Sequence, residues 1–318
     1  MNFGFIGLGE HCSKRMLPAI AESNSSKCIA IASEHYTDKF YNEIPVYNSY
    51  QEILKQNAID AIYIATTSNK HFELCINALN SGKHVLCEKP ICFTFDQANE
   101  LAKTSKRNNK FLAEGFMYKH HEQFKTFTNL LVDNSYGAIL SIRGSYKYNL
   151  SDTTNSRMNV DNGGGAFNDC YCYLINFVQS LINSSLNNSK TKITQNNETL
   201  ILKVESELKF QNSTKAYLTA SMIDKRENKI LIECEYALIE ICNAFHLPRK
   251  MKPLIKIHQS GKINIIEIPK DNHFLNQFNW FAENHKNTEI HSRSLTEIIA
   301  NAKLKDVILE TATFESLN

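Results

Sequence analysis

Charge of one sign is what this sequence most clearly lacks. Its 35 Lys and Arg residues face 33 Asp and Glu residues, so the formal net charge over 318 residues is only +2. Nucleic-acid-binding domains usually concentrate basic residues in a patch or a stripe. The charge balance therefore gives no support for a nucleic-acid partner.

The sequence also lacks long apolar runs and paired cysteines. No run approaches the roughly 18–20 apolar residues that cross a bilayer, so we expect no membrane span. The nine cysteines are odd in number, contain no CxxC pair and follow no signal peptide, which is typical of reduced thiols in a cytoplasmic protein. Cys170 and Cys172 are close together, but no second pair of ligands accompanies them, so we expect no metal site.

The pattern of apolar residues divides the chain into two halves. Up to about residue 120, short apolar runs alternate with longer helical patterns, which predicts an α/β fold with a doubly wound parallel sheet covered on both faces. Later strand patterns with short connections predict an α+β domain, with a large, mostly antiparallel sheet that is solvated on one face. We therefore expect domains at residues 1–120 and 121–318. The polar stretch "NSSLNNSKTKITQNNE", residues 183–198, is typical of a surface loop.

A glycine-rich turn follows the first predicted strand. Gly7, Leu8 and Gly9 precede a helical pattern, and Cys12 occupies the place of a third glycine. Such a turn lets the backbone approach a pyrophosphate, which the helix N-terminus then binds. A tight turn alone also explains two glycines, but their position at the start of a βαβ unit favours a dinucleotide site.

The end of the second predicted strand bears on the choice of dinucleotide. Glu34 lies about 25 residues beyond the turn, where a carboxylate binds the ribose hydroxyls of NAD and repels the 2′-phosphate of NADP. Ser33 and His35 offer an alternative, a cradle for that phosphate if Glu34 points outward, and Glu34 as a solvated loop residue is a third interpretation. We expect NAD or NADP, with NAD favoured.

Charged residues also end the strand within "VLCEKPICFTF". Glu88 and Lys89 follow the apolar residues 85–87, and Pro90 prevents a simple continuation of the strand. Charges at the carboxyl end of a buried strand belong either to a solvated loop or to a site, and such folds bind ligands at that edge.

Three segments together resemble a known family: "GFIGLG", "IYIATTSNKHFELCINALNSGKHVLCEKP" and "GGGAFNDCYCYLIN". From residue 3 to about residue 184 the chain resembles the Gfo/Idh/MocA oxidoreductases, which act on sugars, inositols, dihydrodiols and nucleotide-linked sugars. The combination of EKP with GGGxxxD is more specific than either motif alone. The resemblance implies an N-terminal Rossmann domain that binds NAD or NADP, and a C-terminal domain for substrate binding and oligomerisation.

The resemblance also implies roles for single residues in the first domain. Lys89 of the EKP motif is expected at the active site, and Pro90 is expected to be cis. Together with Ser33 and Glu34, the expected cofactor-binding set is Gly7, Leu8, Gly9, Thr66, Asn69, His71, Glu88, Lys89 and Glu114.

In the second domain the resemblance implies which residues bind the substrate. Arg157 belongs to an N-x-R segment before the triple glycine, and Asp169 completes the second motif. Tyr173 stands where many members have histidine, as in the branch with dihydrodiol dehydrogenase, glucose–fructose oxidoreductase, xylose dehydrogenase and the deoxysugar 3-ketoreductases. Tyr171 departs from a usual glycine, so we expect its large ring to alter the substrate pocket.

The expected reaction explains why these residues matter. Hydride transfer to or from an alcohol carbon needs a group that exchanges a proton with the substrate oxygen. Asp169 and Tyr173 have i, i+4 spacing and share one helix face, so Tyr173 is the expected acid or base. A phenol has a pKa of about 10, and the Lys89 ammonium is expected to favour the phenolate. Asp169 is expected to orient the substrate or to balance the lysine's charge.

We therefore expect an NAD(P)-dependent oxidoreductase that transfers a hydride between nicotinamide and a sugar carbonyl or alcohol. A nucleotide-linked deoxysugar ketone is the first choice of substrate. The expected substrate-binding residues are Lys89, Arg157, Asp169 and Tyr173. A free-sugar or dihydrodiol dehydrogenase is the alternative enzyme. A non-catalytic dinucleotide or sugar sensor is the alternative from another class, although such a sensor needs no acid–base pair. The resemblance further implies a homodimer or homotetramer formed through the C-terminal sheet.

Overall fold

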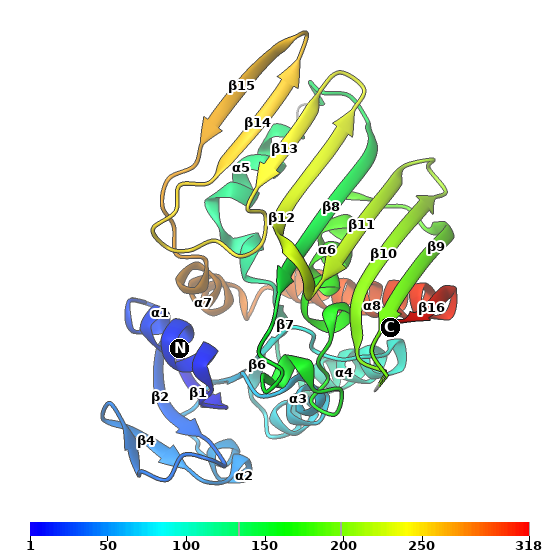
Figure 1. The fold of residues 1–318 in the computed structure, drawn as a ribbon. Coiled ribbons are helices and arrows are strands. Elements are labelled where there is room, and N and C mark those ends of the chain that lie inside the picture. Colours follow the sequence, from blue (N-terminus) through cyan, green and yellow to red (C-terminus); the bar gives the residue numbers. More distant parts are fainter. Residues whose placement is uncertain (133, 198, 318) are drawn as a thin grey trace. The chain divides into compact units, whose positions relative to one another are not determined.

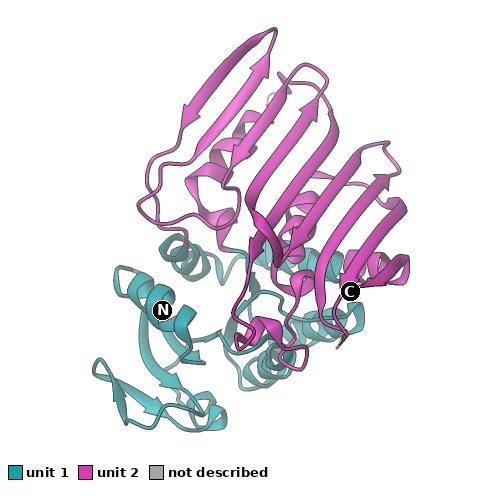
Figure 2. Cartoon of the chain, viewed as in Figure 1, with its two compact units in different colours: residues 1–116, 274–302 teal, residues 117–273, 303–318 magenta. Residues whose placement is uncertain are grey.

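The computed structural model describes residues 1–132, 134–197 and 199–317, which form two compact units (Figure 2). Unit 1 contains residues 1–116 and 274–302, and unit 2 contains residues 117–273 and the segment from Lys303 onward. Each unit has its own sheet and its own buried core.

Unit 1 is built on a seven-stranded sheet with the order β3-β4-β2-β1-β5-β6-β7 (Figure 1). Its strands are β1 (Asn2–Ile6), β2 (Lys27–Ala32), β3 (Phe40–Tyr41), β4 (Ile44–Tyr47), β5 (Ala61–Ile64), β6 (His84–Glu88) and β7 (Leu112–Gly115). All neighbouring strands are parallel except β3 and β4, a hairpin that the sequence analysis missed. The strand order reverses between β1 and β5, and open α/β sheets bind ligands at the carboxyl edge of that point.

Helices cover both faces of this sheet, as predicted. They are the π-helical turn η1 (Cys12–Met16), which continues into α1 (Leu17–Ala21), then α2 (Tyr50–Leu54), η2 (Ser68–Lys70), α3 (His71–Asn80), α4 (Phe95–Asn108), α7 (His273–Asn284) and the first part of α8 (Thr288–Glu310). One face packs against α2, α3, α4 and α8 in a single apolar cluster. On the other face Phe278 of α7 contacts Phe3 and Phe5, with ring centroids 5.3 and 5.8 Å apart.

The domain boundary expected from the sequence needs a correction. The prediction assigned everything from residue 121 onward to the second domain, whereas residues 274–302 belong to unit 1. The physical reason is the aromatic packing of α7, because Phe281 also contacts Phe3 and Phe111 of the parallel sheet. Sequence order alone does not say which of two sheets a late helix covers.

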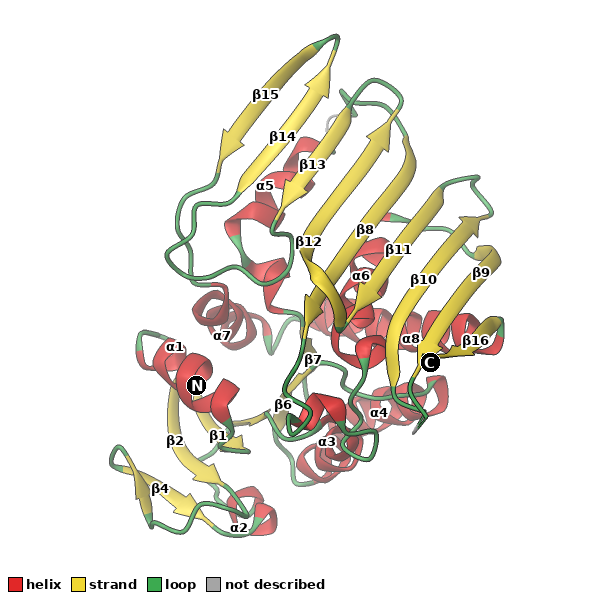
Figure 3. Cartoon of the chain, viewed as in Figure 1, coloured by secondary structure: helices red, strands yellow, loops and turns green. Residues whose placement is uncertain are grey.

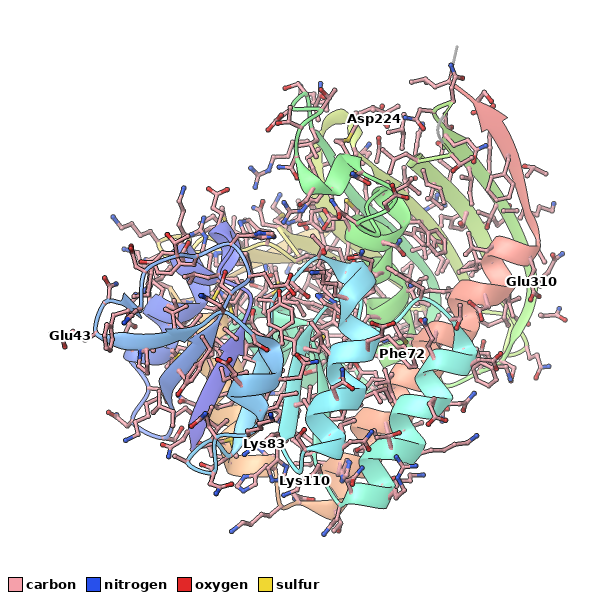
Figure 4. All side chains as sticks on the ribbon, turned by 90° about the horizontal axis from the view of Figure 1, so that it is seen from below. Glu43, Phe72, Lys83, Lys110, Asp224 and Glu310 are labelled. Carbon is pink, nitrogen blue, oxygen red and sulfur yellow. The ribbon has the colours of Figure 1, made fainter. Side chains whose placement is uncertain are left out.

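The amino edge of the parallel sheet carries cations with a structural role. Lys83 and Lys110 each lie two residues before a paired position of β6 and β7, and Figure 4 labels both side chains. The buried Lys83 ammonium donates to the carbonyl oxygens of Gln56 and Ile59, at 2.8 Å each. The Lys83 charge therefore anchors the loop before β5, whereas ligand chemistry is expected at the opposite edge.

Unit 2 is built on a nine-stranded sheet with the order β15-β14-β13-β12-β8-β11-β10-β9-β16 (Figures 1 and 3). The strands are β8 (Ile139–Asn149), β9 (Leu186–Gln195), β10 (Ile201–Phe210), β11 (Lys215–Ser221), β12 (Ile223–Cys234), β13 (Leu238–Cys242), β14 (Leu254–Gln259), β15 (Lys262–Glu267) and β16 (Ala312–Ser316). Neighbours are antiparallel except β8 with β11 and β9 with β16, so the mostly antiparallel sheet is confirmed.

One face of this sheet is buried and the other is more exposed. The inner face packs against α5 (Glu122–Leu130), η5 (Phe167–Tyr171) and α6 (Cys172–Leu181), while η3 (Met117–His120) precedes α5 and η4 (Ser156–Met158) lies in the long connection before η5. Inner residues such as Ile230 and Ile241 are buried, whereas their strand neighbours Leu231 and Glu240 are partly exposed. This alternation confirms the predicted solvated face.

The polar segment at 183–198 was predicted wrongly as a loop. Its residues Leu186–Gln195 form β9, which pairs with β10 on one side and β16 on the other, and Glu198 lies outside the described residues. Thr191 and Ile193 point inward and are buried, so two side chains of the right spacing suffice to place this polar strand in the sheet.

Within the described residues, no helix combines the length and the apolarity that a membrane span requires.

Candidate active site

The glycine turn of unit 1 leaves room for a ligand. Gly7 has a φ of +97°, and a Cβ there would lie 2.6 Å from the carbonyl oxygen of Ala65, so backbone geometry and packing both require glycine. A Cβ added at Gly9 would meet no atom of the described residues within 4 Å apart from its chain neighbours. The space above Gly9 is therefore a cradle that fits the close approach of a pyrophosphate. Cys12 is fully buried and packs where a third glycine often lies.

Beside this turn, Glu34 is paired with a cation that the sequence analysis did not single out. Glu34 follows β2, and its Oε2 accepts a hydrogen bond of 2.7 Å from Nζ of Lys70, at the end of η2. This hydrogen bond is the main cause that lowers the pKa of Glu34, and a hydrogen bond from Tyr50 contributes. Lys70 Nζ also lies 5.6 Å from the centroid of the Tyr50 ring. Ser33 is buried, and its backbone N–H donates to Tyr47.

His71 lies inside the unit rather than at its surface, and both of its ring nitrogens face backbone carbonyl oxygens. It is only 1% exposed, and its Nδ1 and Nε2 lie 2.9 and 3.2 Å from the carbonyl oxygens of Pro90 and Thr66. Burial lowers its pKa, so the ring is neutral near pH 7 and donates through one of its two nitrogens. His71 therefore ties together the loops after β5 and β6.

Other matched residues support the same loops. The Lys89–Pro90 peptide bond is cis, as the resemblance implied. Glu114, at β7, accepts a hydrogen bond of 2.9 Å from the backbone N–H of Ile91, and Asn69 accepts one of 2.6 Å from the Thr67 hydroxyl. The Glu114 contact holds the chain just after the Lys89–Pro90 bond, and the Asn69 contact lies within the loop after β5.

Glu88 is a mostly buried carboxylate with two partners that sequence reasoning missed. It accepts a hydrogen bond of 2.7 Å from the Tyr63 hydroxyl, and its Oε1 lies 3.3 Å from Nε2 of His11, just after the glycine turn. Burial raises the pKa of Glu88, but His11 and Tyr63 outweigh burial, so the net shift is downward. Glu88 thus links the strand that leads to Lys89 with the glycine turn.

In unit 2 the triple glycine builds a tight turn that positions Arg157. The backbone N–H groups of Gly164 and Gly165 donate to the carbonyl oxygens of Asn159 and Arg157, at 3.0 and 2.8 Å. A Cβ at Gly164 would lie 2.3 Å from the Arg157 oxygen, and one at Gly165, whose φ is +96°, would lie 2.9 Å from the Ile201 oxygen. These glycines allow close backbone packing, and they place the segment of Arg157 beside the helix start.

Asp169 is held there by two donors. Nε of Arg157 lies 3.2 Å from its Oδ1, and the hydroxyl of Tyr148, at the end of β8, donates to its Oδ2. The attraction of Asp169 raises the pKa of Arg157, while burial and the same carboxylate raise the pKa of Tyr148, which therefore stays protonated. Sequence reasoning found Asp169 and Arg157 but missed Tyr148, because only the folded sheet brings it near.

Tyr173 lies in an aromatic environment. It is 4% exposed, its ring centroid is 5.4 Å from those of Tyr146 and Phe245, and its hydroxyl lies 3.4 Å from Sδ of Met117. Arg157 is close enough that a negative charge on Tyr173 contributes to raising the arginine's pKa. Within unit 2, Arg157 is thus a positive charge near Tyr173 that the sequence analysis did not associate with this tyrosine.

Tyr171 does not lie with Asp169 and Tyr173. It is fully buried, its ring stacks on Phe167 at 5.3 Å, and its hydroxyl donates to Oγ of Ser206 on β10, at 2.6 Å. The expected intrusion of this ring into the substrate pocket is therefore replaced by packing against the sheet, because residue 171 faces another side of the helix from residues 169 and 173.

Two family models match the chain. One, described as the oxidoreductase family with an NAD-binding Rossmann fold, matches residues 1–116, and the GFO/IDH/MocA C-terminal domain model matches residues 124–240. The chain belongs to the Gfo/Idh/MocA oxidoreductase family. The resemblance seen in the motifs is thereby confirmed, and so is the NAD(P)-binding character of unit 1.

Individual relatives agree with this placement. The chain is 25% identical over 287 residues, covering 88% of it and 86% of the relative, to the dTDP-3,4-didehydro-2,6-dideoxy-alpha-D-glucose 3-reductase of Actinomadura kijaniata. It is 27% identical over 252 residues, covering 79% and 72%, to the trans-1,2-dihydrobenzene-1,2-diol dehydrogenase of Xenopus tropicalis. A solved 3-ketoreductase from A. kijaniata, in complex with NADP and TDP-benzene, shares the fold with a TM-score of 0.93 at 23% identity, covering 100% and 99% of the two chains.

Proposed function

We propose that this oxidoreductase is an NADP(H)-dependent 3-ketoreductase of a nucleotide-linked deoxysugar. The proposal rests on the presence of two residues in one chain. Lys89 of the EKP motif directly follows β6, and Tyr173 lies near the Asp169–Arg157 pair. The relative of A. kijaniata supports the substrate class, because its similarity covers both units. The preference for NAD expected from Glu34 assumed an uncompensated carboxylate, but this carboxylate is paired with Lys70.

We propose that Tyr173 donates the proton that the substrate oxygen receives. When bound, the reduced nicotinamide supplies the hydride to the carbonyl carbon. As the carbon–oxygen π bond breaks, the Tyr173 hydroxyl gives its proton to the substrate oxygen, and the alcohol forms. The Lys89 ammonium donates a hydrogen bond to the same oxygen and favours the resulting phenolate. Solvent then returns the proton to Tyr173.

Arg157 and Asp169 bind and orient the substrate in this proposal. The Arg157 side chain is 49% exposed and keeps donors beyond the Nε that contacts Asp169, since a guanidinium has five N–H groups. A forked cation of this kind suits a diphosphate. Asp169 is fixed by Tyr148 and Arg157, and a fixed carboxylate suits a sugar hydroxyl.

The dihydrodiol dehydrogenase similarity supports a second candidate reaction, oxidation of a cyclic diol without a nucleotide. Both reactions use the same proton exchange at Tyr173, so they differ in what Arg157 binds. Steady-state turnover with a dTDP-linked 3-keto-deoxysugar, with the corresponding free sugar and with a trans-dihydrodiol separates them. The proposal predicts turnover with the nucleotide-linked ketone, and loss of that preference in Arg157→Gln. Turnover of the diol alone supports the second candidate, and cofactor binding without any turnover supports a sensor.

We further propose a cytoplasmic homodimer or homotetramer that forms through the outer face of the unit 2 sheet. Ile263 and Ile265 of β15 are 59% and 57% exposed, and Leu238 of β13 is 36% exposed, which is unusual for isoleucine and leucine in a monomer. Light scattering of the native protein tests this proposal, with Ile265→Glu expected to lower the molar mass. A monomeric native protein contradicts it.

A further inference from the structure

The ion pair between Glu34 and Lys70 spans the place where a dinucleotide is bound. Glu34 follows β2 and Lys70 follows β5, and the strand between them in the sheet is β1. The end of β1 carries the glycine turn at Gly7 and Gly9. A contact from the end of β2 to the loop after β5 therefore crosses the carboxyl edge of the sheet next to that turn.

Both partners are accessible enough to rearrange. Their side chains are 41% exposed for Glu34 and 42% exposed for Lys70, so the pair is solvated and costs little to open. The Tyr50 ring lies under the Lys70 ammonium at 5.6 Å, and Tyr50 also hydrogen-bonds Glu34. Three side chains, from the segment after β2, the end of η2 and the start of α2, thus surround the position of an adenosine ribose at the end of β2.

The chemistry of the pair decides which ribose fits. A lone carboxylate at the end of β2 accepts hydrogen bonds from the 2′- and 3′-hydroxyls of NAD and repels the 2′-phosphate of NADP. Here the carboxylate has a counter-ion at 2.7 Å, so its repulsion is compensated. A Lys ammonium has three N–H donors, and a phosphate dianion is a stronger acceptor than a carboxylate monoanion for such a group.

We propose that Lys70 is the specificity-determining residue that admits the 2′-phosphate of NADP, exchanging Glu34 for the phosphate when this cofactor binds. Glu34 is then the competitor for Lys70, and its carboxylate turns toward solvent, where His35 is also exposed. With NAD the ion pair stays closed, and Glu34 is left to accept the ribose hydroxyls. This inference rests on the proposed function, because it concerns the same cofactor site.

Dissociation constants for NADPH and NADH, measured by nicotinamide fluorescence, test the exchange. Lys70→Gln is expected to weaken NADPH binding by about tenfold to a hundredfold, the range of hydrogen bonds to charged groups. Its effect on NADH is expected to stay within about threefold. Glu34→Gln removes the competitor, so NADPH binds several-fold tighter and NADH binds more weakly. Lys55→Gln removes an exposed positive charge elsewhere in unit 1 and is the control, with neither constant changed.

Fragments of the cofactor test the 2′-phosphate contact separately from the nicotinamide end. The fragments 2′-phospho-AMP and AMP contain no nicotinamide, and calorimetry measures the affinity of the protein for each. The Lys70→Gln variant is expected to lose only the tighter binding that the 2′-phosphate provides. If Lys70→Gln weakens NADPH and NADH equally, or if the native protein binds NADH alone, the inference is wrong while the oxidoreductase site stands. If the native protein binds neither nucleotide, the proposed function fails with it.

Discussion

Each unit carries a glycine-rich turn just before a helix, and the two turns serve different purposes. In unit 1, a Cβ at Gly9 would project into open space, so packing within the described residues does not explain this glycine. In unit 2, a Cβ at Gly164 would lie 2.3 Å from the backbone oxygen of Arg157, so this position is already filled by the protein itself. Backbone packing therefore explains the glycine of unit 2, whereas we propose that the approach of a ligand explains Gly9.

The same contrast applies to the charged residues around the turns. In unit 1 several matched residues hold loops: His71, Glu88 and Glu114 bind backbone carbonyls, side chains or backbone N–H groups of the unit. In unit 2 Asp169 and Arg157 bind each other, and the guanidinium remains half exposed. Residues matched by one family motif thus include some that position the backbone, and only the geometry identifies them.

Of the two turns, the larger effect on stability is expected from filling the occupied one. Gly164→Ala places a methyl group against the backbone oxygens of Arg157 and Asn159, at 2.3 and 2.7 Å, and the tight connection must distort. Overpacking of this kind costs about 1–3 kcal/mol, and backbone on both sides favours the upper end. Urea unfolding followed by circular dichroism measures the change. Native-like stability in this variant contradicts a packing role for the triple glycine.

Filling the open turn is expected to act on affinity instead. Gly9→Ala meets no protein atom, so the free energy of unfolding is expected to change by less than about 0.5 kcal/mol. The added methyl group occupies the space of the pyrophosphate, and the dissociation constants for both NADPH and NADH are expected to rise about tenfold or more. Equal binding by native protein and variant places the cofactor elsewhere.

A smaller effect is expected when Asp169 loses one of its donors. Tyr148→Phe keeps the ring but removes the O–H that Asp169 accepts, so the carboxylate is less firmly oriented. A hydrogen bond to a charged group is worth about 1.5–3 kcal/mol, and we expect about a tenfold loss in kcat/KM, mainly through KM. Tyr236→Phe changes an exposed tyrosine and is the matched control. An unchanged KM in Tyr148→Phe removes Asp169 from substrate binding.

The last change depends on pH and concerns the amino edge of the unit 1 sheet. His84 Nδ1 accepts a hydrogen bond of 2.9 Å from the backbone N–H of Phe111, and burial lowers its pKa to about 4. Since the unfolded chain binds a proton below about pH 6.5 and the folded chain resists it, stability falls as the pH drops from there toward 4. His84→Gln is expected to reduce this dependence, and the remainder comes from other histidines such as His120, whose pKa burial lowers to about 3. His35→Gln changes an exposed histidine and is the matched control. Unfolding midpoints measured across this pH range show whether the two variants differ in this way.

The sequence allowed much of this to be predicted, for reasons that lie in local patterns. The glycine turn, the cis Lys89–Pro90 bond and the helix that carries Asp169 and Tyr173 all follow from short motifs of fixed spacing. Lys70 stayed hidden because its partner lies 36 residues earlier, and Tyr148 because it lies 21 residues before Asp169. Contacts that depend on strand order carry no signal in neighbouring residues.

The sheet that α7 covers and the strand β9 were missed for the same reason. The helix α7 follows the strands of unit 2 in the sequence but covers the sheet of unit 1, since its phenylalanines fit Phe3, Phe5 and Phe111. The strand β9 is polar by composition, and only the pairing with β10 and β16 shows that its alternate residues are buried. Both depend on which surfaces meet after folding.

The central claim is that Lys89 and Tyr173 act on one substrate oxygen. A double-mutant cycle tests it most directly, with kcat/KM measured for the native protein, Lys89→Met, Tyr173→Phe and the double variant on a dTDP-linked 3-keto-deoxysugar. Each single change is expected to cost about 10²–10⁴-fold, the range of general acid–base catalysis. Because the two groups act as a unit, the double variant is expected to be hardly slower than the worse single variant. Losses that multiply in the double variant contradict a shared site of action.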